Sequence, residues 1–230
     1  MNIKQMLGAV FTLVLVNVGT AQADSSNFAG PYIGLSIEGY GVGADGNSKS
    51  TDMNSGGTDN NVQVGKVAAV SGGEIGYAIP VGGSFLLDVG ISALYGEAQL
   101  DYQSDDPGSV MADVALKIDD LYTYYIAPTL VLSDTSSLFI KVGLSEADIG
   151  VKGNITTPGN LSGTTWGIGT RTVLESGVFI RSEAGYTEYN GISAHGKGGG
   201  TAGADIIDQN TSFAAEPTIV HGSISLGFRF

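Results

Sequence analysis

The stretch Ser223-Ile224-Ser225-Leu226-Gly227-Phe228-Arg229-Phe230 closes the chain and decides the fold. Apolar side chains occupy positions 224, 226, 228 and 230, and polar or small residues occupy the positions between them. A period of two places each set on one face of a β-strand. A strand with one fully apolar face that ends in aromatic residues is typical of a transmembrane β-barrel, where that face meets lipid. The pattern predicts an architecture and a location, and it names no activity.

The beginning of the chain is typical of a secretory leader. Lys4 gives a short basic region, residues 7–18 form an apolar core, and Ala21-Gln22-Ala23 is an A-x-A cleavage site. We therefore expect a signal peptide over residues 1–23 and a mature chain that begins at Asp24. No other stretch has about 18 consecutive apolar residues, so the sequence predicts no transmembrane helix. The remaining classes are a soluble all-β domain and an outer-membrane barrel.

The composition excludes several kinds of chemistry. The chain has no Cys, so it forms no disulfide, no reactive thiolate and no Cys-ligated metal site. It has 23 acidic residues against 10 Lys and Arg, a net charge of -13. This balance argues against a nucleic-acid partner, because phosphate binding needs clustered basic side chains. An acidic surface instead suits divalent cations or the cation-bridged lipopolysaccharide layer, and we expect no cofactor.

Eight segments show strand-like alternation over about the 9–11 residues that a tilted membrane strand needs. They are residues 32–42, about 66–78, 85–96, about 120–132, 138–149, about 164–174, 178–189 and about 213–230. Tyrosines fall on both faces of the fourth segment, which leaves its register ambiguous. Short turns alternate with long polar connections at residues 44–65, 101–115, 150–163 and 190–212. The pattern predicts an all-β fold, an eight-stranded antiparallel up-and-down transmembrane β-barrel over residues 24–230, with short periplasmic turns and long extracellular loops. Strand spacing alone also allows a β-sandwich.

Several short motifs add a family resemblance that covers essentially the whole mature chain. They are residues 30–34 (GPYIG), 72–77 (GGEIGY), 121–128 (LYTYYIAP), 166–169 (WGIG), 180–186 (IRSEAGY) and the terminal Phe. The chain resembles the small eight-stranded outer-membrane barrel superfamily, which includes OmpA/OmpX-like and Opacity-like porin-type barrels. The resemblance implies a bacterial outer-membrane location and an assembly signal in the last strand, carried by Phe228 and Phe230. Ser225 departs from the pattern, because the family usually has Gly at that position.

Charged residues on the predicted inward faces form the candidate site. They are Glu38, Glu74, Asp88, Lys141, Arg171, Arg181, Glu183 and Arg229. The lumen of an eight-stranded barrel is just wide enough for side chains to fill it, and an unpaired buried charge is unfavourable. We therefore expect these charges to pair and plug the lumen. A narrow ion pathway is the alternative, although a selectivity filter tends to use charges of one sign.

His221 and Ser223 lie two residues apart on one strand face, which could place a base near a nucleophile. The spacing is loosely similar to the His-x-Ser of outer-membrane lipid A deacylases. Counted back from Phe230, however, both side chains face the lumen, and spacing identifies no acidic third member. We therefore expect no catalytic residues. The acidic loops match no EF-hand spacing, so we expect no defined metal site and leave weak divalent-cation binding open.

The sequence thus predicts a non-enzymatic outer-membrane barrel with a structural or surface-interaction role in the cell envelope. The expected partners are outer-membrane lipid and lipopolysaccharide, the barrel assembly machinery through the C-terminal strand, and a host, phage or cell-surface partner through the loops. Two alternatives from other classes are a narrow channel for ions or small solutes and a lipid-modifying outer-membrane enzyme.

Overall fold

The computed structural model describes residues 24–49, 60–96, 98–101, 115–152, 155–174, 176–197 and 212–230. The expected signal peptide over residues 1–23 and much of the expected long loops lie outside the described residues. Within the described part of the chain, no helix is long and apolar enough to cross a membrane.

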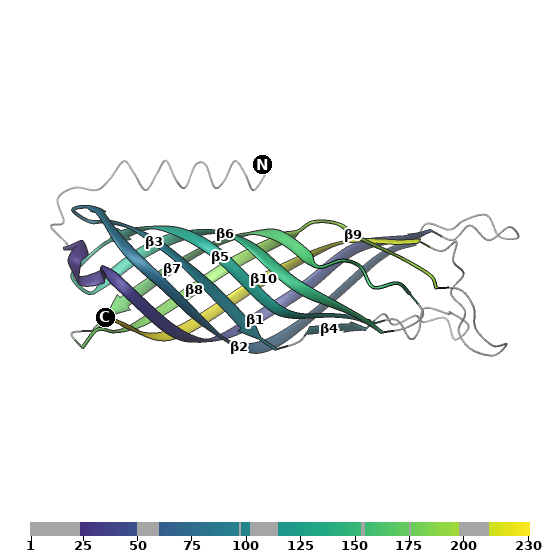
Figure 1. The fold of residues 1–230 in the computed structure, drawn as a ribbon, viewed down its shortest axis with the longest axis horizontal. Coiled ribbons are helices and arrows are strands. Elements are labelled where there is room, and N and C mark those ends of the chain that lie inside the picture. The colour runs from purple at the N-terminus through teal and green to yellow at the C-terminus, as the bar shows by residue number, and fades with distance from the viewer. Residues whose placement is uncertain are drawn as a thin grey trace, which may run out of the picture.

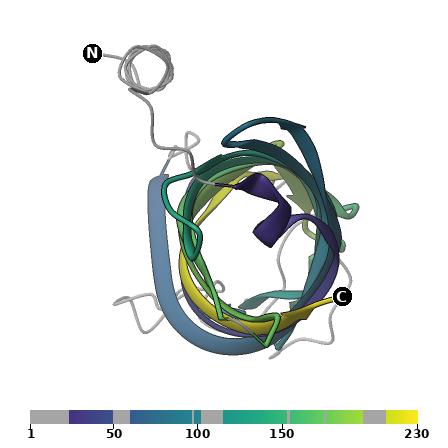
Figure 2. The ribbon, with the colours of Figure 1, turned by 90° about the vertical axis from the view of Figure 1, so that its left-hand side faces the viewer.

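One 3-10 helix precedes a continuous series of antiparallel strands (Figure 1). The elements are η1 (Ser25–Phe28), β1 (Gly30–Lys49), β2 (Asn60–Gly82), β3 (Phe85–Tyr95), β4 (Ala98–Asp101), β5 (Ala115–Val131), β6 (Ser136–Lys152), β7 (Leu161–Val173), β8 (Val178–Tyr189), β9 (Ile192–His195) and β10 (Ser212–Arg229). The main strands follow the order β1-β2-β3-β5-β6-β7-β8-β10, and β1 also pairs with β10. This last pairing closes the sheet into a ring (Figure 2).

The short strands β4 and β9 do not add strands to the barrel wall. Each continues the line of the preceding main strand, and we call each such line around the barrel a stave. The β3–β5 pairing ends at Leu94↔Leu121, and β4 then continues beside β5 from Ala98↔Ile118. In the same way, β9 continues the line of β8 beside β10. The barrel therefore has eight staves, two of them interrupted, and the prediction of a closed eight-stranded antiparallel barrel is confirmed.

The staves extend further than the sequence pattern indicated. Residues 44–65 were expected to be a long loop, but β1 continues to Lys49 and β2 begins at Asn60. Strands β1 and β10 pair without a break from Tyr32↔Arg229 to Lys49↔Ser212. A tilted strand of this length rises roughly 45 Å along the barrel axis, whereas the apolar band of an outer-membrane barrel is about 25 Å tall. A large part of the wall must therefore stand outside the membrane.

The polarity of the outer surface shows which end protrudes. Toward the short turns, the outward side chains are large and apolar, among them Ile33, Leu35 and Ile37 on β1 and Ile224 and Leu226 on β10. Toward the long loops, the outward positions of the same wall become acidic, and they include Asp45, Glu146, Asp148, Glu188 and Glu216. The apolar part fits lipid and the acidic part fits water, so the long-loop end is the part that protrudes.

Four aromatic residues lie on the outer face of the wall: Tyr77, Tyr95, Trp166 and Tyr186. The first three side chains are exposed on the outer surface, and Tyr186 is partly exposed beside Trp166 on the neighbouring strand. Aromatic rings of this kind are common at the boundary between the apolar band and the polar region of a membrane.

A β-bulge explains why the fourth segment was ambiguous. The β5–β6 register shifts between Asp119 and Tyr122, and Asp120 has a φ of 47°, in the left-handed region. An extra residue at a bulge reverses the alternation between faces. Beyond the bulge, Tyr122 and Tyr124 face outward and Tyr125 faces the lumen, where it is buried.

Inward-facing glycines leave room for large rings that lie across the neighbouring strand. A Cβ atom added at Gly76 would lie 2.4 Å from the Tyr32 hydroxyl oxygen, and one added at Gly90 would lie 2.7 Å from Cζ of Tyr125. In the register, Tyr32 is opposite Gly76 and Tyr125 is opposite Gly90. Several of the chain's 36 glycines therefore serve to pack the lumen rather than to make turns.

The substitution Gly76→Val tests this packing. It should force the Tyr32 ring out of position and lower the free energy of unfolding by about 1–3 kcal/mol, the usual effect of overpacking. The matched control is Gly39→Val on the outer face of β1, where an added Cβ meets nothing within 4 Å. Urea unfolding of the refolded barrels measures both, and equal effects of the two substitutions would contradict the packing argument.

Candidate functional site

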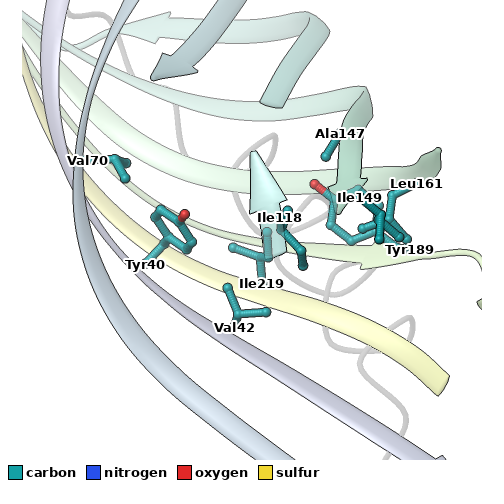
Figure 3. Close-up of a cluster of buried hydrophobic side chains, with 9 residues drawn as sticks. All are labelled: Tyr40, Val42, Val70, Ile118, Ala147, Ile149, Leu161, Tyr189 and Ile219. Carbon is teal, nitrogen blue, oxygen red and sulfur yellow. The ribbon is translucent and has the colours of Figure 1, made fainter. Parts of the chain in front are cut away.

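The lumen contains three successive layers of buried side chains between the short turns and the long loops. The lower apolar layer, nearest the short turns, consists of Phe28, Tyr32, Ala78, Leu86, Val131, Val173 and Phe179. The charged layer above it contains Glu38, Glu74, Asp88, Lys141, Arg171, Arg181, Glu183 and His221. The upper apolar layer consists of Tyr40, Val42, Val70, Ile118, Ala147, Ile149, Leu161, Tyr189 and Ile219 (Figure 3).

The lowest ion pair of the charged layer joins β3 and β7. Arg171 donates from Nη2 to both carboxylate oxygens of Asp88, at 2.7 and 2.6 Å. Thr129 on β5 donates its hydroxyl to the same carboxylate. The side chains of Arg171 and Asp88 are only 2% and 1% exposed, so the pair is removed from water. A buried pair of this kind is stable only when its remaining hydrogen-bonding capacity is met, and Thr129 supplies part of that.

Aromatic rings surround the cationic side of this pair. The Arg171 guanidinium lies 5.3 Å from the centre of the Tyr32 ring and 5.9 Å from that of Phe179, and these two rings meet edge to face. A guanidinium over an aromatic face is attracted by the ring's quadrupole. The lower apolar layer therefore both covers the ion pair and holds its cation in place.

Arg181 is the centre of a second ionic group. Its Nη1 lies 2.9 Å from a carboxylate oxygen of Glu74 on β2. Its Nη2 lies 3.1 Å from a carboxylate oxygen of Glu183, which is on β8 like Arg181 itself. Lys141 on β6 lies 2.8 Å from the other oxygen of Glu183. The guanidinium carbon of Arg181 also lies 4.0 Å from the centre of the Phe139 ring. Side chains from three strands thus meet at one buried arginine.

Hydroxyl groups extend this network around the wall. Tyr125 donates to Glu74 at 3.1 Å, and the hydroxyls of Tyr125 and Tyr32 lie 2.9 Å apart. Starting from β5, a row of four buried hydroxyls crosses four neighbouring strands, from Thr123 through Ser145 and Thr165 to Thr187. Because the charged and polar side chains bond one another across strands, they link neighbouring and facing strands through the lumen.

The structure brings six of the eight predicted lumen residues into these two ionic groups: Glu74, Asp88, Lys141, Arg171, Arg181 and Glu183. Glu38 is buried beside them, near His221, Lys141 and Glu183. Arg229 does not join the network. It lies at the short-turn end of the barrel, where its Nη1 donates to the carbonyl oxygen of Ala29 at 3.0 Å.

Some members of the site were missed from sequence. His221 contacts Glu183, with Nε2 3.4 Å from Oε1, so it belongs with the charged layer. Tyr32 and Phe179 could have been found, because the alternation of their strands places both on the inward face. Tyr125 could not be found, because the bulge that sets its direction leaves no mark in the hydrophobic pattern.

His221 and Ser223 both face the lumen, as the count from Phe230 predicted. Within the described part of the chain, the hydrogen-bond partner of the imidazole is Glu183 rather than Ser223. An added Cβ at Gly185 would lie 2.4 Å from the imidazole, so the ring lies against the wall of β8.

The predicted assembly residues lie on the outer surface at the short-turn end. Phe228 and Phe230 are exposed, and their rings meet edge to face with centres 5.2 Å apart. The Phe230 N–H donates to the carbonyl of Pro31 at 3.0 Å, so the last residue is bonded beside the first strand. Their role in assembly stays a prediction.

Among the described residues, no group of three or more His, Asp or Glu side chains is arranged to hold a metal ion. The lumen carboxylates are instead engaged by arginine, lysine and hydroxyl donors. Many of the acidic loop residues considered for weak cation binding lie outside the described residues.

A closed eight-stave barrel with an apolar outer band and a packed polar lumen defines an integral outer-membrane β-barrel protein. The family model described as "Outer membrane protein beta-barrel domain" matches residues 10–215, so the chain belongs to that family. The comparison with curated proteins gave no match. The family and the fold place this protein in the outer membrane of a Gram-negative bacterium.

Solved outer-membrane barrels are similar in fold. The outer membrane protein OprG from Pseudomonas aeruginosa is 11% identical, with a TM-score of 0.53 over 92% of this chain and 100% of OprG. Ail of Yersinia pestis, solved with the heparin analogue sucrose octasulfate, is 12% identical, with a TM-score of 0.40 over 87% of this chain and 99% of Ail. The outer membrane protease OmpT from Escherichia coli is 10% identical, with a TM-score of 0.37 over 86% and 97%. At these identities the likeness concerns the fold alone.

A double substitution tests the buried pair. Arg171→Met alone should lower the free energy of unfolding by about 3–5 kcal/mol, because it leaves the Asp88 charge buried without its cation. Adding Asp88→Leu should restore most of the loss, because an apolar pair of similar volume can replace a buried ion pair. Urea unfolding of the refolded protein measures the wild type and the two variants.

The control for this cycle is Lys152→Met on the exposed end of β6, which should change stability by about 0.5 kcal/mol or less. A double variant that is no more stable than Arg171→Met would show that the two side chains do not act as a pair.

Proposed function

We propose that this protein is a non-enzymatic, sealed barrel that contributes to the cell envelope and carries an interaction surface above the membrane. The observation that carries the proposal is the filled lumen, in which the Asp88–Arg171 pair is almost completely shielded from water. Short turns of bacterial barrels face the periplasm and long loops face the outside. The lower apolar layer is therefore periplasmic and the upper one extracellular.

The arrangement of charge favours a seal over a channel. An ion pathway needs charged groups that water and ions can reach, and a filter tends to use one sign. Here carboxylates and cations bond one another directly, as in the Glu74–Arg181–Glu183 group. Apolar layers lie above and below them, and an ion would have to cross both without water. The narrow channel stays the second candidate because charged groups do line the centre of the lumen.

The protruding wall supports the surface role. Its outward side chains include five carboxylates at Asp45, Glu146, Asp148, Glu188 and Glu216. In the register Asp45 is opposite Glu216 and Asp148 is opposite Asp119, and Asp119 also forms an ion pair with Lys117 at 2.8 Å. An acidic outer surface of this kind suits divalent cations. Cation-bridged lipopolysaccharide is the partner of this wall, and the loops above it meet host, phage or other cell surfaces.

An assembly role for the last strand completes the proposal. Phe228 and Phe230 stand on the outer surface at the periplasmic end. Exposed aromatic rings there are available to the barrel assembly machinery before they meet lipid. The expected signal peptide over residues 1–23 would deliver the chain to that machinery.

A lipid-modifying activity is the least supported alternative. His221 lies in the charged layer against Glu183, and Ser223 faces the same closed lumen. A bulky lipid substrate lies on the opposite side of the wall. The OmpT comparison carries no argument for a reaction here, because only the fold is similar.

The sealed lumen predicts the electrical behaviour of the protein. Purified, refolded protein in planar bilayers should give no stable conductance steps, because both apolar layers exclude hydrated ions. Heat-modifiable migration on a gel verifies that the tested material is folded. Reproducible openings of the folded protein would contradict the seal.

Arg181→Ala distinguishes the seal from a channel in the same preparation. In a sealed barrel it should lower the free energy of unfolding by about 3–5 kcal/mol, because Glu74 and Glu183 lose their shared cation. Unchanged stability together with altered conductance would favour the channel instead.

The absence of enzymatic activity has its own test. The mass spectrum of lipid A should be the same in cells that express wild-type protein, the Ser223→Ala variant or neither, because the Ser223 side chain faces the lumen. A mass change that requires wild-type protein and disappears with Ser223→Ala would establish the enzyme alternative.

A further inference from the structure

The segment before β1 lies inside the periplasmic mouth of the barrel. Figure 2 looks into this end and shows η1 within the ring of strands. Asp24 caps the helix, and its carboxylate accepts a hydrogen bond from the Ser26 N–H at 2.9 Å. That bond lowers the pKa of the Asp24 carboxyl. The segment is thus an ordered part of the described structure with its own local cap.

Phe28 fixes this segment to the lumen. Its side chain is 0% exposed and belongs to the lower apolar layer, together with Tyr32, Leu86 and Phe179. Tyr32 and Phe179 are the two rings over which the Arg171 guanidinium lies. Phe28 is therefore packed against the same rings that shield the Asp88–Arg171 pair from the periplasm.

Few polar bonds hold the segment, and they come from three separate parts of the rim. The Ser25 N–H donates to Gly83 in the β2–β3 turn at 3.3 Å, and Asn27 Nδ2 donates to Asp134 in the β5–β6 turn at 3.4 Å. Arg229 donates to the Ala29 carbonyl at 3.0 Å. The first two bonds are long, so they hold the segment weakly. The side chain of Phe28 is the main anchor.

The segment joins the wall at a glycine. Gly30 has a φ of +111°, a backbone conformation that side chains other than glycine rarely adopt. An added Cβ there would lie 2.9 Å from the carbonyl oxygen of Phe230. The chain therefore turns sharply between β1 and the segment in the periplasmic mouth at Gly30, a residue whose backbone can also adopt other φ and ψ values.

We propose that residues 24–29 form a removable stopper that closes the periplasmic mouth and turns about Gly30. When the stopper is seated, Phe28 completes the lower apolar layer. When it leaves, periplasmic water and small solutes reach that layer and the Asp88–Arg171 pair above it. The upper apolar layer does not depend on the stopper, so the barrel becomes a cavity open to the periplasm and stays closed to the outside.

Single cysteines test the stopper in the full-length protein, because the natural chain has none. Val131→Cys places a thiol in the lower apolar layer, where Val131 is 2% exposed. With Phe28 in place, a membrane-impermeant maleimide supplied from the periplasmic side should react slowly. Adding Phe28→Ala should raise the labelling rate at least tenfold, because the anchor is lost. Adding Phe28→Leu, which keeps an apolar anchor, should leave the thiol largely protected.

Two further thiols serve as controls. Thr135→Cys, on the exposed β5–β6 turn, should react rapidly at the same rate in all backgrounds. Leu161→Cys, in the upper apolar layer, should stay protected with and without Phe28. Heat-modifiable migration confirms that each variant is folded.

Equal labelling of Val131→Cys in the Phe28 and Phe28→Ala backgrounds would overturn the proposal. Faster labelling of Leu161→Cys in Phe28→Ala would also overturn it, because the outer closure would then depend on the stopper. If Phe28→Ala does not fold, Arg229→Met takes its place. It keeps Phe28 and removes the 3.0 Å bond to the Ala29 carbonyl, so Val131→Cys should label severalfold faster, and an unchanged rate would refute the stopper.

Discussion

The whole structure depends on the lumen of an eight-stave barrel being too narrow for bulk water. Inward side chains are therefore mostly apolar or bonded to partners inside the lumen. The Asp88–Arg171 pair, the Arg181 group and the hydroxyl row are three solutions to that one requirement. The inward glycines serve the same end, because they let Tyr32 and Tyr125 lie across neighbouring strands and fill space that would otherwise be empty.

The polarity of the two faces of the wall differs between its two ends. In the lipid band the outer face is apolar and the inner face carries charges, whereas toward the long loops the outer face is acidic and the inner face is apolar. Within the lipid band, β1 presents Ile33 and Leu35 outward and Glu38 inward. Further along the same strand, Val42 points inward and Asp45 outward. Even-numbered positions face the lumen throughout, so the register does not change, but the solvent outside does. The extracellular part is thus built like a water-soluble barrel with an apolar core, joined without a break to a membrane barrel.

This reversal explains how far sequence reasoning could go. Alternation between apolar and polar residues identified all eight staves and the direction of the lumen charges, because lipid enforces the contrast at positions such as Ile224 and Leu226. The alternation could not be followed along β1 beyond about Val42. The reason is that Gly43, Asp45 and Gly46 show little contrast in polarity between the two faces where the strand meets water. Partners were also beyond reach, because Arg181 with Glu74 and Arg229 with Ala29 depend on which strands adjoin across the lumen and at the rim. The 3-10 helix η1 gave no periodic signal at all, because four residues are too few.

The bond between the Phe230 N–H and the Pro31 carbonyl has a topological meaning. It places the first and last strands, β1 and β10, side by side in a ring in which each of the eight main strands has two neighbours. Within such a ring β1 is no more the beginning than β6 is, and a cyclic permutation of the staves would leave every pairing intact.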